Sequence, residues 1–230
     1  GFEDPRSHGI ADFVNLVLMC MGAAPHLLWD VFMENVASMT SEHRTEITKQ
    51  LESLGVGLPC RFDAAELGQI HRPRLYWTTF AAEIDGFEAK NSGRGYLAMR
   101  NLSKERIPVK EFLDVGCSKG GPDGIPFPTS VRWIQRSKPP ADPAGIEECN
   151  ADDLERWTDC RYAMPPYQFK KELGVVTSTG DIRPPNADER ERLHGYPPSH
   201  TKGFAEPRRI SFIGNAFHCV AVPCLLASWA

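Results

Sequence analysis

The sequence has no C-x-x-C pair, and no unbroken apolar stretch in it is long enough to span a membrane. Its seven cysteines are scattered, so zinc and redox motifs are not indicated and we expect no metal ion. Unpaired cysteines of this kind fit a reducing, intracellular compartment. No basic flank and apolar run of a signal peptide follow Gly1. Because Gly1 is not methionine, we interpret the start as a cut or an incomplete gene model.

The net charge is also small, at -4, and the chain has 41% hydrophobic and 24% charged residues. These values are typical of a globular protein with one sizeable domain, or one domain and an insert. The positive charge is concentrated, since residues 90–138 hold ten Lys or Arg and four acidic residues. Such a stretch can bind a phosphate backbone, although an ordinary solvated surface explains it equally well from charge alone.

Hydrophobic patterns predict an α/β fold for the first part of the chain. Residues 11–21 predict a helix buried on most sides, and residues 27–32 predict a buried parallel strand. A helix capped by Ser41 follows, and residues 56–62 and 74–80 are two further strand candidates. Alternation of strands and helices is typical of an α/β sheet.

After about residue 84 the sequence becomes rich in Gly, Pro and charge. We therefore expect residues 1–84 to form part of an α/β domain and residues 85–204 to form a separate irregular lobe. Its tryptophans and tyrosines give that lobe a core to bury, so we do not expect disorder. Residues 205–230 are expected to return to the α/β domain as a final helix.

Two helix starts stand out near the end of the chain. Asn186 and Glu189 have the spacing of a capping box. Gly214-Asn215 precede an apolar stretch, residues 216–229, which predicts a last helix with a kink or a late start at Pro223. The free amides of a helix N-terminus could hold the polar part of a cofactor, although Asn is also an ordinary N-cap residue.

Glu34 is a candidate catalytic residue because it follows the predicted strand 27–32. Ligands of open α/β sheets bind at the carboxyl ends of strands. A partly buried carboxylate there can share a proton with a ring nitrogen. A surface glutamate at a strand end is the competing interpretation.

Arg72 and Arg74 are candidates for binding a carbonyl oxygen or a phosphate, for which a guanidinium supplies fixed donors. We expect the two side chains to leave the strand start on opposite faces. Only one of the two arginines is therefore expected to reach the same pocket as Glu34. A solvated basic strand start is the competing interpretation.

Taken in order, these motifs resemble the DNA cytosine-5 methyltransferases, most closely their de novo branch. The resemblance covers most of the chain outside the middle lobe. The segments that carry it are Asp4-Pro5-Arg6-Ser7, Phe32-Met33-Glu34-Asn35-Val36, His71-Arg72-Pro73-Arg74 with Tyr76-Trp77, Arg183-Pro184-Pro185-Asn186 with Glu189 to Pro197, and Gly214-Asn215-Ala216-Phe217.

The resemblance implies a partial Rossmann-like sheet that binds S-adenosylmethionine, with an inserted target-recognition lobe. It implies methyl transfer to C5 of a cytosine flipped out of double-stranded DNA. Glu34 would hold N3 and the exocyclic amine, Arg74 would contact O2, and Arg72 would support the site or the backbone. Asn35, with Val36 beside it, would brace the nucleophile loop. The residues bordering the cofactor would be Gly214, Asn215 and Ala216.

The same resemblance implies DNA binding by the lobe. The arginines and lysine that we expect to contact DNA are Arg94, Arg100, Lys104, Arg132, Arg136 and Arg183. Partners would be double-stranded DNA and a homologous or regulatory methyltransferase subunit, with no membrane. The location would be the nucleus in a eukaryote. A transfer RNA substrate, which one branch of the family methylates, remains an alternative.

The chain departs from the family pattern in two respects. Ile70 stands where the family commonly has glutamine, and Gln69 is one place away. The nucleophilic cysteine of the family's Pro-Cys loop, the Gly-rich cofactor loop and the acidic ribose-binding residue are all expected before Gly1. The chain alone is therefore expected to be inactive.

Three segments could be mistaken for the missing parts. Pro59-Cys60 lies in a predicted strand after Glu34, and Pro223-Cys224 lies in the predicted last helix. Residues 112–120 have the look of a Gly-rich cofactor turn, but no convincing helix follows, so we interpret them as a turn of the lobe.

Two other hypotheses remain. The chain could be a non-catalytic relative that binds DNA or a partner subunit, or a fragment that does not fold alone because it exposes strand edges. A binding-only relative has no chemical need for Glu34, Arg72 and Arg74, and this favours the enzyme.

Overall fold

The computed structural model describes residues 9–37, 39–80, 86–102, 106–121, 126–127 and 174–227. The chain divides into two compact units. The first, here called the sheet unit, comprises Gly1–Asp63, Pro73–Ser103 and Cys224–Ala230. The second, called the α4–α5 unit, comprises Ala64–Arg72 and Lys104–Pro223. The boundary expected at residue 84 falls inside the sheet unit.

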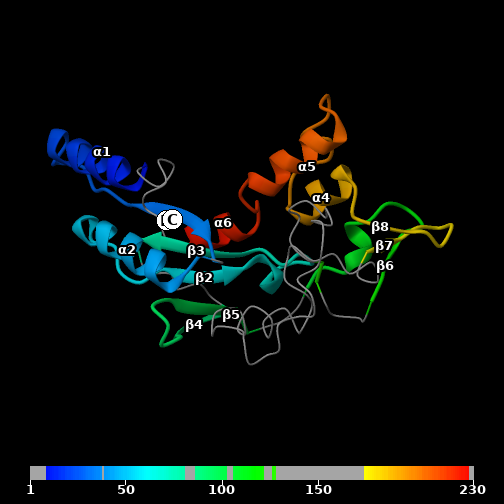
Figure 1. The fold of residues 1–230 in the computed structure, drawn as a ribbon, viewed down its shortest axis with the longest axis horizontal. Coiled ribbons are helices and arrows are strands. Elements are labelled where there is room, and N and C mark those ends of the chain that lie inside the picture. The colour runs from blue at the N-terminus through cyan, green and yellow to red at the C-terminus, as the bar shows by residue number, and fades with distance from the viewer. Residues whose placement is uncertain are drawn as a thin grey trace. The chain divides into compact units, whose positions relative to one another are not determined.

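A five-stranded mixed sheet, in the order β1-β3-β2-β5-β4, forms the centre of the sheet unit (Figure 1). Its strands are β1 (Phe32–Val36), β2 (Cys60–Asp63), β3 (Pro73–Thr78), β4 (Phe87–Asn91) and β5 (Leu97–Asn101). β3 is antiparallel to both β1 and β2, β2 is parallel to β5, and β4 is antiparallel to β5. This mixed α/β sheet is compatible with a Rossmann-like sheet.

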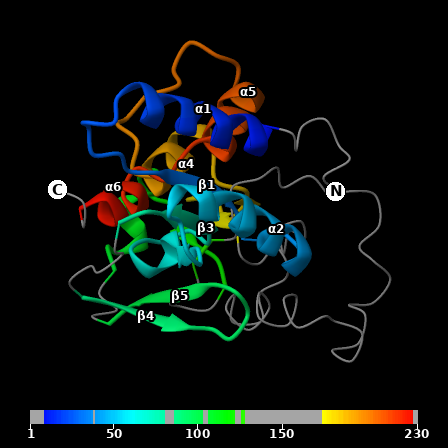
Figure 2. The same cartoon turned by 90° about the vertical axis from the view of Figure 1, so that its left-hand side faces the viewer.

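The helices of the sheet unit are α1 (Gly9–Ala23) and α2 (Ser41–Leu51), followed by the short 3-10 helix η2 (Glu52–Leu54) (Figure 2). Leu75 and Trp77 of β3 are fully buried with Ile47 and Leu51 of α2 in one core. The Trp77 Nε1 donates a hydrogen bond of 2.9 Å to Thr48 Oγ1. Helix α2 therefore covers the face of β3 that carries Leu75 and Trp77.

Several predictions for the sheet unit are confirmed and others are wrong. Strands do form near residues 56–62 and 74–80, but they are shorter. The strand expected at 27–32 was wrong: β1 starts at Phe32 and is antiparallel to β3. Pairing with β3 sets these limits, because β3 ends at Thr78, opposite Phe32.

Helix α1 was expected to be buried on most sides, and this is wrong. Only Val14 is buried, while Leu16, Leu18 and Met19 are exposed. The helix contacts α2 and η2 through a single stripe, which explains why the rest of its apolar surface stays open. The cap of α2 is Thr40, one residue before the predicted Ser41, and its side chain accepts a hydrogen bond from His43 N.

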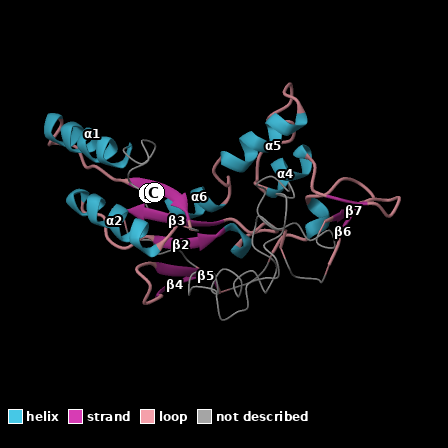
Figure 3. Ribbon diagram, in the orientation of Figure 1, coloured by secondary structure: helices cyan, strands magenta, loops and turns pink. Residues whose placement is uncertain are grey.

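Residues after 84 were expected to be irregular, but β4 and β5 extend the sheet to Asn101 (Figure 3). Arg44 of α2 holds the connection between these two strands. Its buried guanidinium donates to Arg94 O at 2.6 Å and lies 5.1 Å from the centre of the Tyr96 ring. These two contacts attach the glycine-containing turn between β4 and β5 to helix α2.

The described part of the α4–α5 unit contains a three-stranded sheet in the order β6-β7-β8 and the helices α4 and α5. The elements are η3 (Ala64–Glu66), η4 (Val109–Glu111), β6 (Ser118–Lys119), β7 (Val175–Val176), β8 (Ile182–Arg183), α4 (Ala187–Leu193) and α5 (Glu206–Asn215). Its core is made by Ile70, Leu113, Phe127, Val175 and Leu193. This burial explains why an apolar residue stands at position 70.

The helix boundaries near the end of the chain differ from the prediction. The capping box at Asn186 and Glu189 is confirmed. The long helix expected at 216–229 was wrong, because α5 ends at Asn215 and only a short helix, α6 (Ala221–Leu226), follows. The late start expected from Pro223 is confirmed, since Pro223 lies in the first turn of α6, where a missing N–H does no harm.

Candidate functional site

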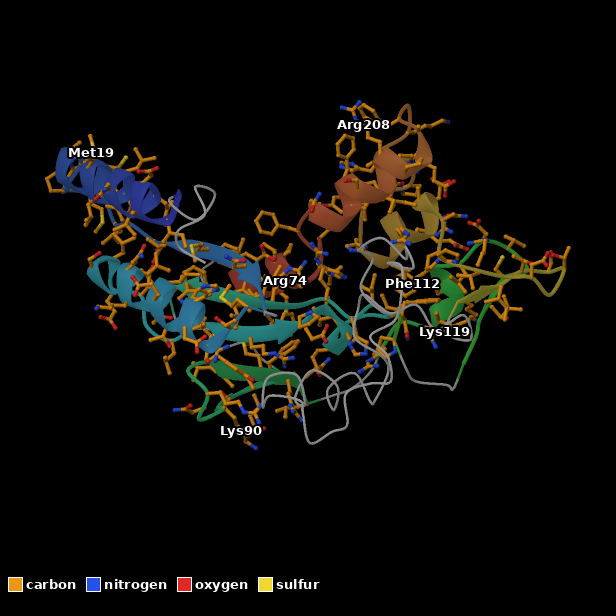
Figure 4. The ribbon with its side chains drawn as sticks, in the orientation of Figure 1. Met19, Arg74, Lys90, Phe112, Lys119 and Arg208 are labelled. Atoms are coloured by element: carbon orange, nitrogen blue, oxygen red, sulfur yellow. The ribbon has the colours of Figure 1, made fainter. Side chains whose placement is uncertain are left out.

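Glu34 and Arg74 form an ion pair on the sheet unit (Figure 4). The distance from Arg74 Nε to Glu34 Oε1 is 2.6 Å, and the two side chains are 11% and 20% exposed, respectively. Strand register brings them together: Glu34 lies opposite Tyr76 and Val36 lies opposite Arg74, so Glu34 and Arg74 are diagonal neighbours on one face. The two charges lie close together in a partly buried place, where screening by solvent is weaker than at an exposed surface.

The pair has hydrogen-bonding capacity left over. Besides Glu34, Arg74 binds Pro73 O through Nη1 at 2.9 Å. Among the described residues, no hydrogen bond to Glu34 Oε2 or from Arg74 Nη2 is formed. One acceptor atom and one donor atom of the pair therefore remain unused among the described residues, and both side chains are accessible in part to solvent. Such a pair can bind a flat group that presents a donor next to an acceptor.

The surroundings of the pair are aromatic. The ring of Phe32 lies 5.6 Å from Tyr76 and 6.3 Å from Phe80. Phe32, Glu34, Arg74 and Tyr76 share one face by strand alternation, opposite the face that α2 covers. Apolar rings beside the ion pair lower the local dielectric and so strengthen its polar interactions.

The sequence suggested that Glu34 ends its strand, and this is wrong. It is the third of the five residues of β1, and the residues before and after it in the chain also pair with β3. Glu34 therefore lies within a strand rather than in a loop. Asn35, expected to brace a loop beside Glu34, points to the opposite face, and its Oδ1 accepts from Val36 N at 2.7 Å. Val36 is the last residue of the strand and is exposed.

Arg72 has a different set of partners from Arg74, in agreement with the expectation that only one of the two would reach Glu34. It belongs to the α4–α5 unit and is 3% exposed. Its Nη1 and Nη2 donate to Gly214 O at 3.1 and 3.2 Å, and Nη2 also donates to Ala216 O. Arg72 lies just before β3, which begins at Pro73. Strand alternation does not explain the different partners, because residues two apart in an extended segment point to the same side.

The predicted cofactor segment lies at a helix C-terminus, which corrects the expectation of an N-terminus. Gly214 and Asn215 are the last residues of α5, and Ala216 is its C-cap. Free carbonyls rather than free amides occur at such an end, and Arg72 occupies those of Gly214 and Ala216. The side chain of Asn215 is exposed, and its amide can both donate and accept. This residue fits a polar edge of a nucleoside cofactor, whereas the neighbouring carbonyls do not.

The expected DNA-contacting residues fall into three groups. Arg94 and Arg100 belong to the sheet unit and are exposed, with Arg100 opposite Glu88 across β4 and β5. Arg183 is held by Glu189 through two hydrogen bonds of 2.5 and 3.0 Å, so much of its donor capacity is already used. The remaining three, Lys104, Arg132 and Arg136, lie outside the described residues.

Sequence analysis missed a polar network in the α4–α5 unit. Glu189, which is fully buried, accepts from Arg183 and also from the backbone amides of Asp114 and Asn186 at 3.1 and 2.9 Å. Burial alone would raise the pKa of Asp114, but hydrogen bonds from Arg192 and Asn186 lower it below its usual value. Only the capping box hinted at this network, and it did not reveal Arg183 or Asp114 as members.

A second buried group in this unit surrounds the connection from α5 to α6. The rings of His194 and His218 lie 5.7 Å apart. Burial lowers the pKa of His194 well below its ordinary value, and the positive charge of Arg72 adds to this effect. Tyr196 donates to Phe217 O at 2.9 Å. Burial, with a hydrogen bond to Cys219, raises the pKa of Tyr196 to about 12.

Cys60 and Cys224, the cysteines of the two Pro-Cys pairs, are unsuited to act as a nucleophile. Burial raises the pKa of Cys60 to about 11, and burial also raises the pKa of Cys224. A thiol attacks as its thiolate, so neither is activated. Residues 114–117 form a turn in which the amide of Cys117 donates to Asp114 O, and strand β6 follows at Ser118. This confirms the interpretation of residues 112–120 as a turn.

Neither a metal cluster nor a membrane helix is found within the described ranges. No group of three or more His, Cys, Asp or Glu side chains there could hold a metal ion. No helix among the same residues has both the length and the hydropathy needed to cross a bilayer.

No protein-family model matches the sequence, and no curated protein matches it significantly.

Proposed function

We propose that this chain is the C-terminal part of an enzyme that transfers a methyl group from S-adenosylmethionine to C5 of cytosine in DNA. The observation that carries the proposal is the ion pair between Glu34 and Arg74 at 2.6 Å, with a free acceptor and a free donor beside it among the described residues. The two residues lie on different strands, and the family resemblance assigns both to the same base.

The free groups of the pair are complementary to one edge of cytosine. That edge presents the exocyclic amine, the ring nitrogen N3 and the carbonyl O2 in a row. Glu34 accepts from the amine and shares a proton with N3, and Arg74 donates to O2. Their ion pair holds the two groups 2.6 Å apart before the base arrives, as electrostatic preorganisation requires.

Glu34 is also placed to act on charge that develops during the reaction. When a nucleophile attacks the ring, electron density moves toward N3, and a proton held between Glu34 and N3 stabilises it. Arg74 keeps the carboxylate oriented and prevents it from rotating away. The base must leave the DNA stack to reach such a partly buried pair.

S-adenosylmethionine would supply the methyl group. Asn215 is the residue of the predicted cofactor segment whose side chain is open to a ligand, and Arg72 keeps the backbone on either side of it occupied. Recognition of the cofactor by this segment therefore depends on a side-chain amide rather than on backbone groups.

An alternative is a non-catalytic relative that binds DNA or a partner subunit. A cross-strand ion pair also stabilises the pairing of two strands without any chemistry, and the exposed Arg94 and Arg100 would serve phosphate binding alone.

The experiment measures transfer of a labelled methyl group from S-adenosylmethionine to duplex DNA. It uses this chain alone and a polypeptide in which a segment with the expected Pro-Cys loop precedes it. We expect transfer only in the longer polypeptide. Within it, Glu34→Gln should lower kcat about 100- to 1,000-fold, because a preorganised charge at the reacting ring is lost, with little change in DNA affinity.

The matched control is Glu88→Gln, which removes a carboxylate from another ion pair of the same sheet. Glu88 lies 3.0 Å from Lys90 on the exposed strand β4, and this variant should keep full turnover. Unchanged kcat in Glu34→Gln would remove Glu34 from the mechanism. DNA binding without methyl transfer in the longer polypeptide would favour the non-catalytic relative.

A further inference from the structure

The connection from α5 to α6, residues 214–220, is held by hydrogen bonds from residues outside it. Arg72 donates to the carbonyls of Gly214 and Ala216, and Tyr196 donates to that of Phe217 at 2.9 Å. The amide of Cys219 donates to His194 O at 2.8 Å. All these residues belong to the α4–α5 unit.

The ring of His218 closes the connection. Its Nε2 lies 3.2 Å from Leu193 O, and its Nδ1 accepts from the amides of Val220 and Ala221 at 3.3 and 3.2 Å. An imidazole that donates at Nε2 and accepts at Nδ1 is neutral. The same ring therefore fixes the end of α4 and the start of α6.

Arg72 satisfies the end of α5 from a distant part of the chain. The last carbonyls of a helix lack intrahelical partners and carry a partial negative charge. The buried guanidinium of Arg72, 142 residues away in the sequence, donates to the carbonyl of Gly214 and also places a positive charge beside it. Without it, two carbonyls would be left unsatisfied, and a buried carbonyl without a partner is strongly unfavourable. The backbone at Asn215 would then shift to reach water.

The side chains on this segment behave differently from its backbone. Gly214 is buried and its carbonyl is occupied, while the side chains of Asn215 and Phe217 are exposed. The contacts of Arg72 and Tyr196 thus lock the main chain on both sides of Asn215 and leave the Asn215 amide open.

We propose that Arg72 is a positioning residue for the cofactor rather than a residue that contacts the base. It holds the carbonyls of Gly214 and Ala216 so that the Asn215 amide is presented to a nucleoside-containing ligand. The inference rests on the proposed function, because it takes S-adenosylmethionine as that ligand. It separates the roles of two arginines that are two residues apart: Arg74 serves the base through Glu34, and Arg72 serves the cofactor through the end of α5.

The test measures binding of S-adenosylmethionine by titration calorimetry, in the polypeptide that carries the Pro-Cys segment ahead of this chain. Arg72→Lys keeps the charge but loses the planar fork that bridges two carbonyls, and we expect affinity to fall at least about tenfold. Tyr196→Phe removes one neutral hydrogen bond and should weaken binding about two- to tenfold. In both variants KM for the cofactor should rise more than kcat falls.

Arg192→Lys is the matched control within the same unit. Arg192 also donates to a backbone carbonyl, Phe112 O at 2.8 Å, and pairs with Asp114. Among the described residues, its side chain forms no hydrogen bond with residues 214–220. It should leave cofactor affinity unchanged. Equal losses in Arg192→Lys and Arg72→Lys would show a general loosening of the unit and would overturn the inference.

Hydrogen exchange without cofactor gives a second measurement. In Arg72→Lys the amides of Ala216 and Cys219 should exchange faster, while those of α4 keep their protection. Unchanged exchange and unchanged cofactor affinity in Arg72→Lys would overturn the positioning role alone. Failure of the unsubstituted polypeptide to bind S-adenosylmethionine would overturn the proposed function, and the inference with it.

Discussion

Two carboxylates of this protein, Glu34 on β1 and Glu189 on α4, each bind an arginine, but they differ in how fully they are satisfied. Glu189 is fully buried, and its two oxygens accept from Arg183 and from two backbone amides. Glu34 is 20% exposed and is bound through Oε1 only, among the residues described.

The difference shows which of the two can do chemistry. A carboxylate with every lone pair engaged in a buried network fixes a structure and has no capacity for a ligand. A carboxylate held on one side by an arginine, and open on the other, is oriented and still available. In the α4–α5 unit the charges of this network satisfy one another, whereas the sheet unit leaves one ion pair partly open.

The largest effect on stability is expected from Glu189→Ala. It leaves Arg183 and two backbone amides without their acceptor, and removing one partner of a buried pair destabilises by about 3–5 kcal/mol. Denaturant unfolding, together with hydrogen exchange of the α4 amides, would measure it. A loss below about 1 kcal/mol would contradict the structural role that we assign to Glu189.

Glycines in the two units provide a second test. Gly195 and Gly55 both have φ = 78°, so Ala at either position costs about 1–2 kcal/mol for the left-handed backbone. A Cβ on Gly195 would also lie 2.8 Å from Val220 Cγ2, while a Cβ on Gly55 meets nothing within 4 Å. Gly195→Ala should therefore destabilise more than Gly55→Ala in denaturant unfolding. Equal losses would mean that Val220 moves aside without penalty.

A pH dependence is expected in the α4–α5 unit because of His194. Burial lowers its folded-state pKa well below the ordinary 6.5, so the unfolded chain takes up a proton that the folded chain refuses. Stability is therefore fully present above about pH 6.5 and falls as the pH drops below it, by at most about 1.4 kcal/mol per pH unit.

The pH dependence would be measured as unfolding free energy between pH 7 and pH 5. His194→Gln should flatten the slope. His26→Gln, at an exposed position of the sheet unit, should leave it as it is. A slope that persists in His194→Gln would assign the effect to another group.

The smallest effect on stability is expected from Glu34→Gln. Partly exposed ion pairs contribute about 0–1 kcal/mol, so this variant should unfold at nearly the denaturant concentration of the unsubstituted chain. In the longer polypeptide the same substitution should lower methyl transfer. A stability loss as large as that of Glu189→Ala would remove the contrast between the two carboxylates.

Local patterns in the sequence predicted local structure well. Asn186 and Glu189 form the predicted capping box, and Ile47, Leu51 and Leu54 line the buried side of α2 and η2. In these cases the interacting groups lie within a few residues of one another, so that the spacing contains the whole interaction.

The same local patterns failed where a distant strand decided the outcome. Residues 27–31 are apolar enough for a strand, yet the ladder between β1 and β3 begins at Phe32, opposite Thr78. Beyond it, Thr79 N donates to Val31 O at 3.2 Å without extending the strand. Gly214-Asn215 suggested a helix start, but α5 continues to Asn215.

The sequence by itself determined which residues carry the candidate chemistry, since Glu34, Arg72, Arg74 and Asn215 are recognisable as motifs. Only the tertiary structure decided which partner each of these residues contacts. Strand register places Arg74 beside Glu34, and a contact across 142 residues gives Arg72 to the end of α5. The physical reason is that a guanidinium binds any accessible acceptor, and only the fold determines which acceptor lies within reach.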